Sequence, residues 1–576
     1  MNFLKKIFQT LSVVEKKKIF FLLLLILIGA ILELASIGII LPAVKVFTDS
    51  EFLNRFYQFT GIPELNSELL VFFVMFSIVG VFAIKNIFLW TVLKFKSSFL
   101  SSYLGNLQIK VFKGYLSKNM SYLSNKNSST IIYDILNLTG FFSSVYLDSI
   151  ILLVIELVIL IGVLSLLLYY NLQITLVLII IFGGCILAIY LLNKKKLKNI
   201  GRDRNFFSEK QLEDLQRGIG GIREIKILGK ESFFVNNFKT STNRLVDANY
   251  ISSIISGTPR LLIEFLAVFC LTITITILTI EGKKLAEYLP LLALYFAATY
   301  KLMPSFQKLI FLMNRLKYSQ HTAKQLLNLL PEVLVNENIY NIKGNKLVFS
   351  SEISINNLSF KYPKTEKYIL SNINFKIQKN SFVGICGESG VGKSTLIDLI
   401  AGLIEPNKGS ILVDNVDIFK NLRNWQNVIG YVPQNIFLIP DSIKNNIALG
   451  LDSSEIDDKL LDQAIDKSFL REFIESLPDK ENTIVGEHGS LISWGQRQRI
   501  GIARSLYNNP SVLIFDEATS SLDPETEENI LKEIKLLKRN LTLIFISHKQ
   551  SSLKSCDKVF YLKNKTIFQN FQHVKE

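Results

Sequence analysis

A glycine-rich loop that ends in a lysine followed by two hydroxyl residues is the strongest chemical feature of this sequence. The pattern G-x-x-x-x-G-K-S/T follows the apolar stretch 382–386 and precedes an apolar segment that begins at Leu396. Between a strand and a helix, such a loop curls backbone N–H groups around phosphates, and its lysine reaches the β- and γ-phosphates. The hydroxyl of the residue after the lysine, Ser394, can ligate Mg²⁺. The predicted phosphate loop consists of Gly387, Glu388, Ser389, Gly390, Val391, Gly392, Lys393, Ser394 and Thr395.

Two acidic residues follow a second apolar strand. The run 512–515 predicts a buried strand, and Asp516 and Glu517 come directly after it. Ligand sites of open α/β sheets lie at the carboxyl ends of the strands, so we expect these carboxylates beside the phosphate loop. There Asp516 would hold Mg²⁺ through water, and Glu517 would orient and polarise the attacking water. A solvated acidic turn is the alternative, which the upstream phosphate loop disfavours.

From about residue 353 onward these motifs resemble the nucleotide-binding domain of ABC transporters, and the whole chain is similar to the exporter half-transporters. The resemblance implies ATP and Mg²⁺ as cofactors. It implies that Tyr362 stacks on adenine, that Gln434 senses Mg²⁺ and the membrane domain, and that His548 contacts the γ-phosphate. Taken singly, these three residues would more often be ordinary surface or turn residues. The resemblance also implies nucleotide contacts from Ser493, Gly495, Gln496 and Asp523.

The signature segment departs from the family pattern at one position. Where the family has Leu-Ser-Gly-Gly-Gln, this chain has Ile492, Ser493, Trp494, Gly495 and Gln496. In the family this turn opens a helix whose N-terminus and serine hydroxyl hold the γ-phosphate bound to the opposite subunit. A glycine there supplies either a positive φ or room for a close approach. We expect Trp494 to be tolerated but to slow hydrolysis.

The amino-terminal half is more apolar than a soluble enzyme. Hydrophobic residues form 49% of the 576-residue chain, and the mean hydropathy is +0.32. Six stretches approach or exceed the roughly 20 residues with which a helix crosses a bilayer. The predicted spans are 19–44, 69–93, 142–169, 172–192, 261–280 and 285–303. We therefore expect a six-helix membrane domain of the ABC exporter type at 1–330, a linker at 331–350, and an α/β P-loop ATPase domain at 351–576.

Basic residues indicate which loops are cytoplasmic. Lysine and arginine are concentrated in the connections 94–141 and 193–260, whereas the loop 49–68 is net acidic. The positive-inside rule then places both termini in the cytoplasm. The net charge of +15 belongs to this topology and does not indicate a nucleic-acid partner. We expect both connections to be helical arms. Residues 122–129 are a contact helix or a polar turn, and 221–226 resembles the exporters' second intracellular loop.

Charged residues in or beside the apolar spans bear on the cargo. An ionisable side chain inside a bilayer needs a partner or a function. Through Pro259-Arg260, the stretch 300–305 and the first external loop, the chain resembles bacterial lipid-linked oligosaccharide flippases. This resemblance implies that cavity cations bind the pyrophosphate of the lipid. The matching cations are Lys85, Arg260, Lys301 and Lys308. Alternatively, they neutralise Glu33, Glu156 or Glu264 or extend to the membrane interface.

The resemblance predicts a homodimer through both domains, because each chain supplies one phosphate loop and one signature segment and a monomer has no complete ATP site. We expect it to flip a polyprenyl-pyrophosphate-linked oligosaccharide across the bacterial inner membrane, driven by ATP. An exporter of another lipid, a peptide or a drug would use the same ATPase. A channel gated by ATP or a regulatory scaffold is an alternative of another class, since a fold does not determine a function.

Overall fold

The computed structural model describes residues 11–569, except 40–41, 44–45, 47–51, 54–66, 171, 281–284, 335–345, 364, 519–531, 533–534, 537, 539 and 549–552. The chain separates into two compact units. One comprises Met1–Lys118 and Lys126–Glu337, and the other comprises Asn119–Asn125 and Asn338–Glu576. Most of the predicted linker lies outside the described residues, so the predicted domain bounds stay a prediction. The same holds for most of the predicted external loop.

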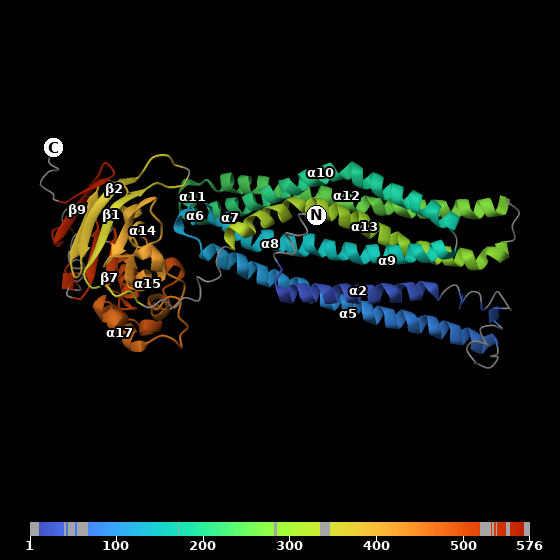
Figure 1. The fold of residues 1–576 in the computed structure, drawn as a ribbon, viewed down its shortest axis with the longest axis horizontal. Coiled ribbons are helices and arrows are strands. Elements are labelled where there is room, and N and C mark those ends of the chain that lie inside the picture. Colours follow the sequence, from blue (N-terminus) through green and yellow to red (C-terminus); the bar gives the residue numbers. More distant parts are fainter. Residues whose placement is uncertain are drawn as a thin grey trace. The chain divides into compact units, whose positions relative to one another are not determined.

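Long helices that lie side by side build the first unit (Figure 1). An apolar run in a bilayer must satisfy its backbone polar groups internally, and a helix does so. Each of the six predicted spans overlaps one helix: α2 (Val13–Gly38), α5 (Ser67–Leu116), α9 (Asp148–Tyr170), α10 (Leu172–Gly220), α12 (Glu231–Ile280) and α13 (Leu285–Val333). In the described part of the chain, three segments are long and apolar enough to cross a membrane, namely Val13–Ser36, Glu68–Leu116 and Ser128–Tyr169. The count of six spans stays a prediction.

Both predicted arms are helical. Helices α5, α10 and α12 contain 50, 49 and 50 residues, which is about twice the length of a membrane span. Helix α11 (Ile222–Leu228) joins α10 to α12. Between α5 and α9 lie α6 (Met120–Leu123), α7 (Ser128–Ile132), the π-helical turn η1 (Tyr133–Leu138), α8 (Thr139–Phe141) and the π-helical turn η2 (Phe142–Leu147).

The predicted contact segment 122–129 covers the end of α6, a turn at 124–127 and the start of α7. Asn119 caps α6 through its side chain, which accepts from the backbone N–H of Tyr122. The backbone N–H of Met120 donates to the carbonyl of Leu403 at 3.2 Å, and α6 groups with the second unit. The helix therefore begins two residues before the predicted segment, at Met120.

Two sheets form the framework of the second unit. The antiparallel sheet has the order β2-β1-β4-β5, with β1 (Glu352–Phe360), β2 (Leu370–Gln378), β4 (Lys408–Val413) and β5 (Val416–Asp417). The larger sheet has the order β10-β9-β3-β8-β7-β6 and is parallel except for β10. Its strands are β3 (Phe382–Gly387), β6 (Ile429–Val432), β7 (Val512–Asp516), β8 (Thr542–Ile546), β9 (Lys558–Lys563) and β10 (Thr566–Gln569).

Helices flank these sheets in the second unit (Figure 1). Helix α14 (Lys393–Ile400) follows β3, and α19 (Trp494–Leu506) precedes β7. The other described helical elements after β5 are η4 (Ile418–Asn421), α15 (Leu422–Gln426), α16 (Ile443–Ile447), α17 (Asp458–Lys467), α18 (Arg471–Glu475), η5 (Lys480–Asn482) and η6 (Glu487–Gly489). The central strands β7 and β8 are buried at every position, as strands covered on both faces must be. The predicted strands before the phosphate loop and before Asp516, and the predicted helix after the loop, are confirmed.

Candidate functional site

Loops that follow four neighbouring parallel strands meet at one edge of the six-stranded sheet. In the order β3-β8-β7-β6, the phosphate loop follows β3 and Asp516 ends β7. Asp516 is in register with Ile546, the last residue of β8, and His548 lies two residues beyond it. Gln434 lies two residues after β6. The fold thus brings to one edge residues that are far apart in the sequence.

The phosphate loop holds its lysine across the turn. Lys393 is the first residue of α14 and is 6% exposed. Its Nζ donates to the carbonyls of Gly387 and Glu388 at 3.1 and 3.0 Å. A Cβ on Gly387 would lie 2.4 Å from the carbonyl oxygen of Leu562, so only glycine fits there. Gly390 has a φ of +76°, and a Cβ there would meet nothing within 4 Å, which leaves that side of the loop open.

Asp516 is a buried carboxylate in which one oxygen accepts a hydrogen bond and the other accepts none from the described residues. The side chain is 8% exposed, and burial raises the pKa of its carboxyl. Its Oδ2 accepts a hydrogen bond from the Tyr431 hydroxyl at 3.1 Å. Among the described residues, Oδ1 is buried and has no hydrogen-bond partner. A buried unsatisfied acceptor is costly unless something binds it, and a hydrated cation is a suitable partner.

Glu517 bridges two of the loops. Its Oε1 lies 3.5 Å from Nζ of Lys393, and its Oε2 accepts from Nε2 of Gln434 at 3.3 Å. Its φ is 48°, a left-handed conformation that glutamate rarely adopts. Strained backbone of this kind is typical of functional sites. The ion pair with Lys393, the hydrogen bond from Gln434 and this backbone geometry fix the direction of the carboxylate.

These groups fit a magnesium nucleotide. The ammonium of Lys393, the backbone N–H groups at the start of α14 and the hydroxyl of Ser394 suit phosphate oxygens and a hard cation. Gln434 and Asp516 supply the further oxygens that Mg²⁺ prefers. When bound, Mg²⁺ would neutralise charge on the phosphates. In this arrangement Glu517 is the carboxylate that can orient a water.

Outside the signature segment, the structure describes two of the remaining predicted nucleotide contacts. Tyr362 lies beside the phosphate loop, with its hydroxyl 3.3 Å from Oγ1 of Thr395 and its ring edge-on to Phe360. His548 is exposed at the sheet edge, after Ser547, whose N–H donates to the carbonyl of Ile385. Asp523 lies outside the described residues. The three roles inferred from resemblance remain predictions.

Two residues beside Asp516 were not predicted to have a role. Tyr431 lies on β6 and contacts Asp516 through its hydroxyl. Asp398 lies on α14, and burial together with the nearby Asp516 raises its pKa to about 6. Tyr431 is only three residues before Gln434, so its place near the site could have been expected from the sequence. Its contact depends on the pairing of β6 with β7, which no local motif indicates.

We expect Tyr431→Phe to weaken the hold of the site on the cation. The hydroxyl is positioned to orient Asp516, and a hydrogen bond to a charged group contributes about 1.5–3 kcal/mol, or roughly a tenfold or larger change in affinity. Mn²⁺ binding in the presence of a non-hydrolysable nucleotide, followed by electron paramagnetic resonance, measures this directly. Tyr507→Phe is the control, since the hydroxyl of this buried tyrosine accepts from the Asp457 N–H, away from the sheet edge. Equal Mn²⁺ affinity in the two variants would remove Tyr431 from this role.

The signature turn is a regular helix start. Ser493 caps α19 and forms a capping box with Gln496, with distances of 3.2 and 2.8 Å. Trp494 is the first helical residue and is not among the residues with positive φ. A glycine is therefore not needed here for a positive φ. The other reason for a glycine at this position, room for a close approach, remains. A Cβ on Gly495 would meet nothing within 4 Å.

We expect Trp494→Gly to raise ATP turnover about twofold or more, provided that the indole keeps an opposing nucleotide from its closest approach. Glycine weakens the start of a helix by up to about 1 kcal/mol, so Trp494→Ala separates loss of the indole from loss of helix propensity. Steady-state ATPase assays with thermal unfolding as a check on folding measure both. Ser493→Ala should lower turnover. A folded glycine variant that is unchanged or slower would show that the indole is accommodated.

In the structure, each described member of the predicted cargo cations lies beside a glutamate. The pairs are Lys85–Glu33 at 3.8 Å, Lys308–Glu156 at 2.8 Å and Arg260–Glu264 at 2.8 Å. These are the acids named by the structural alternative. The cationic side chains differ in exposure, which is 9% for Lys85, 64% for Lys308 and 69% for Arg260. The side chain of Lys301, on α13, lies outside the described residues.

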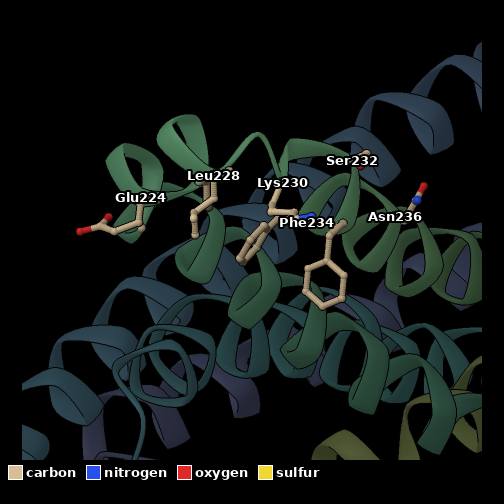
Figure 2. A pocket seen from close by; sticks show the side chains of 9 residues that line it. Glu224, Leu228, Lys230, Ser232, Phe234 and Asn236 are labelled. Carbon is tan, nitrogen blue, oxygen red and sulfur yellow. The ribbon is translucent and has the colours of Figure 1, made fainter.

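The tip of the second arm presents apolar surface. Gly229 ends α11 in a left-handed conformation with a φ of 59°. Ile227 and Leu228, just before it, are mostly exposed. Exposed apolar groups of this kind mark contact surfaces. Figure 2 shows the hollow between α11 and the start of α12, lined by Glu224, Leu228, Lys230, Ser232, Phe234 and Asn236 among others.

Two family models match the chain. The model described as "ABC transporter" matches residues 370–520, and that described as "ABC transporter transmembrane region" matches 18–280. An "ATP-dependent lipid A-core flippase" of Wigglesworthia glossinidia brevipalpis is 29% identical over 500 residues, 83% of each chain. One of Burkholderia orbicola (strain AU 1054) is 25% identical, over 89% of this chain and 86% of the other. A solved bacterial Atm1-family ABC exporter with ATP bound has a TM-score of 0.77 at 21% identity, covering 96% and 95% of the two chains.

Proposed function

This chain belongs to the ABC exporter half-transporters, and we propose that it works as a homodimer that flips a lipid-linked substrate across the bacterial inner membrane. Its ABC transmembrane region and its ABC ATPase domain are fused in one chain, which makes it a multi-pass membrane protein that hydrolyses ATP. The open surface at Ser493 and Gly495, where a second subunit would present its nucleotide, supports the homodimer. Two ATP molecules then lie between two ATPase domains.

The favoured cargo is a polyprenyl-pyrophosphate-linked oligosaccharide. Relatives named for flipping lipid A-core support a lipid over a peptide or a drug. The observation that carries the finer proposal is the exposure of the cations at Arg260 and Lys308 on helices of the membrane unit. Exposed ammonium and guanidinium groups can exchange a glutamate for a pyrophosphate by charge-assisted hydrogen bonds. Another lipid that carries an anionic headgroup is the runner-up.

In the proposed cycle the chain's own residues hold the nucleotide and position water. Lys393 and the phosphate loop bind the β- and γ-phosphates, Ser394, Gln434 and Asp516 hold the cation, and Glu517 orients the attacking water. The exposed tip of α11 is the surface that transmits domain closure, as the resemblance of 221–226 to the second intracellular loop implies. Binding closes the dimer and hydrolysis reopens it, so the membrane helices alternate between two access states.

The proposed topology places both termini in the cytoplasm. Basic residues are concentrated in the two helical arms, and an acidic loop separates the first two predicted spans. An even number of spans then returns the ATPase domain to the side where ATP is available. The proposed cavity cations would meet the lipid headgroup between the two leaflets.

Transport of defined lipids by the purified protein in sealed vesicles tests the function. We expect ATP-dependent movement of a polyprenyl-pyrophosphate glycan to the far leaflet, and none with a non-hydrolysable nucleotide. Movement of a different lipid alone would replace the cargo while keeping the exporter. An ATP-dependent ion current across a planar bilayer, without any lipid movement, would favour the channel. Nucleotide binding without turnover would favour the scaffold.

A further inference from the structure

Exposed lysines gather at one end of the apolar stretches of two helices. Helix α10 carries four of them directly after its predicted span, and α2 carries three directly before its own. The residues are Lys194, Lys195, Lys196 and Lys198 on α10, and Lys16, Lys17 and Lys18 on α2, and together they form the lysine belt. Leu197, inside the α10 run, is fully buried, so the helix packs inward through that position while the lysines remain exposed.

Contacts with α13 establish the level of the α10 lysines along the membrane unit. A Cβ on Gly201 would lie 1.9 Å from the carbonyl oxygen of Tyr318, so the two helices touch there. A second contact, four residues further along both helices, shows that they run in the same direction. Lys198 precedes Gly201 by three residues, and Arg315 precedes Tyr318 by three. At about 1.5 Å per residue, Lys198 and Arg315 lie at the same level.

Arg315 connects this level to three further helices. Its Nη1 lies 3.1 Å from Oδ2 of Asp148 on α9, and Oδ1 of Asp148 lies 2.9 Å from Nζ of Lys96 on α5. One residue before Lys96, the ring of Phe95 contacts the ring of Phe21 on α2, with centroids 5.2 Å apart. The α2 lysines lie three to five residues before Phe21, which is within about 8 Å of the same level.

On α2 and α10, the described side chains that are exposed on the membrane side of this level are apolar. Representative residues are Leu187, Leu191 and Leu192 on α10, and Phe20, Leu24 and Leu27 on α2. On α5, Trp90 is 60% exposed, and the ammonium of Lys94 lies over its ring at 5.4 Å. Exposed tryptophan beside lysine is typical of the membrane–water interface. The belt therefore lies where the hydrocarbon region ends and the headgroups begin.

The lysines of the belt form no ion pair with any residue that the structure describes. Glu15, the nearest carboxylate in sequence to the α2 lysines, instead accepts from the Ser12 N–H and from Asn106.

We propose that the lysine belt binds the phosphodiester headgroups of anionic phospholipids in the leaflet beside it, the cytoplasmic one in the proposed topology. Lysine suits this task, because its flexible apolar stem follows the helix while its ammonium reaches the headgroups. Anionic leaflets attract clustered lysines at this depth.

Lipid selectivity of the full-length protein in nanodiscs tests the proposal. Spin-labelled phosphatidylglycerol and phosphatidylcholine are compared as probes, and electron paramagnetic resonance measures the fraction of each that the protein immobilises. We expect wild-type protein to prefer phosphatidylglycerol about threefold or more at low salt, and the preference to disappear at about 1 M salt. The quadruple variant Lys194→Gln, Lys195→Gln, Lys196→Gln and Lys198→Gln should lose at least about half of this preference.

Two matched variants complete the test. Lys→Arg at the same four positions keeps the charge and should keep the preference, which also covers the case in which the glutamine variant does not fold. A control removes the same charge elsewhere, at the exposed residues Lys239, Lys408, Lys420 and Lys459, and should behave as wild type. A wild-type preference that is absent or insensitive to salt overturns the proposal. So does an undiminished preference in the glutamine variant, which would mean that the lysines are solvated or covered by a second copy.

Discussion

Glu517→Gln is expected to lower ATP turnover by about two orders of magnitude or more while ATP still binds. An amide cannot polarise a water as a carboxylate does. It keeps the shape of the side chain and can still accept from Nε2 of Gln434, which now lies 3.3 Å from the carboxylate. The attraction to Nζ of Lys393, at 3.5 Å, is lost, so the lysine remains free for phosphate. The variant should accumulate as a closed dimer with nucleotide bound.

Steady-state phosphate release and binding of a fluorescent ATP analogue measure the two halves of this expectation. Crosslinking between the two ATPase domains reports closure. Glu475→Gln is the matched control, because this glutamate is exposed on α18 and forms no ion pair in the described part of the chain. Turnover of Glu517→Gln within about threefold of wild type would reject Glu517 as the group that positions water.

The elements around the phosphate loop were predictable because the motif is local. A strand, a glycine-rich loop and a helix occupy consecutive residues, so β3 and α14 follow from the pattern alone. The same holds for β7, an unbroken apolar run that ends in Asp516. The helical arms were also predictable from length and charge. The position of α6 was not, because a four-residue helix depends on its cap at Asn119 and on its contact with Leu403.

Contacts between segments that are distant in the chain could not be predicted from the sequence. Tyr431 reaches Asp516 only because β6 pairs with β7, a register that no motif records. Glu156 and Lys308 are 152 residues apart, and they meet because α9 packs against α13. Arg260 and Glu264 are the exception. They are four residues apart on one helix, so their pairing follows from helical geometry.

Arg260→Ala is expected to abolish flipping of a polyprenyl-pyrophosphate glycan while ATP hydrolysis stays within about threefold of wild type. A pyrophosphate that crosses the cavity would bind cations from two subunits through charge-assisted hydrogen bonds. The guanidinium is 69% exposed and its pair with Glu264 lies within one helix. Exposed pairs of this kind add little stability, so the variant should fold normally. Parallel assays of lipid movement and phosphate release in vesicles measure both quantities, and Glu264→Gln is the control.

Lys85 requires a different design, because its pair with Glu33 is buried. Both residues are under 10% exposed. Lys85→Ala would remove one partner of a buried ion pair, which typically costs about 3–5 kcal/mol of stability. Loss of flipping in the single variant would therefore not separate cargo binding from misfolding. The double variant Lys85→Ala with Glu33→Gln removes both charges and should restore stability.

The double variant decides the role of Lys85. If Lys85 binds the cargo, flipping stays abolished after stability returns, and Lys301→Ala and Lys308→Ala should show the same selective loss. If Lys85 only neutralises Glu33, both stability and flipping recover together. The same logic applies to Arg260, for which a stability loss rescued by Glu264→Gln would assign the arginine to structure. The variant Lys85→Ala with Glu33→Gln thus distinguishes a buried ion pair from a cargo site. Neutralising the acid restores stability after a buried pair is broken, but it cannot replace a cation that binds phosphate.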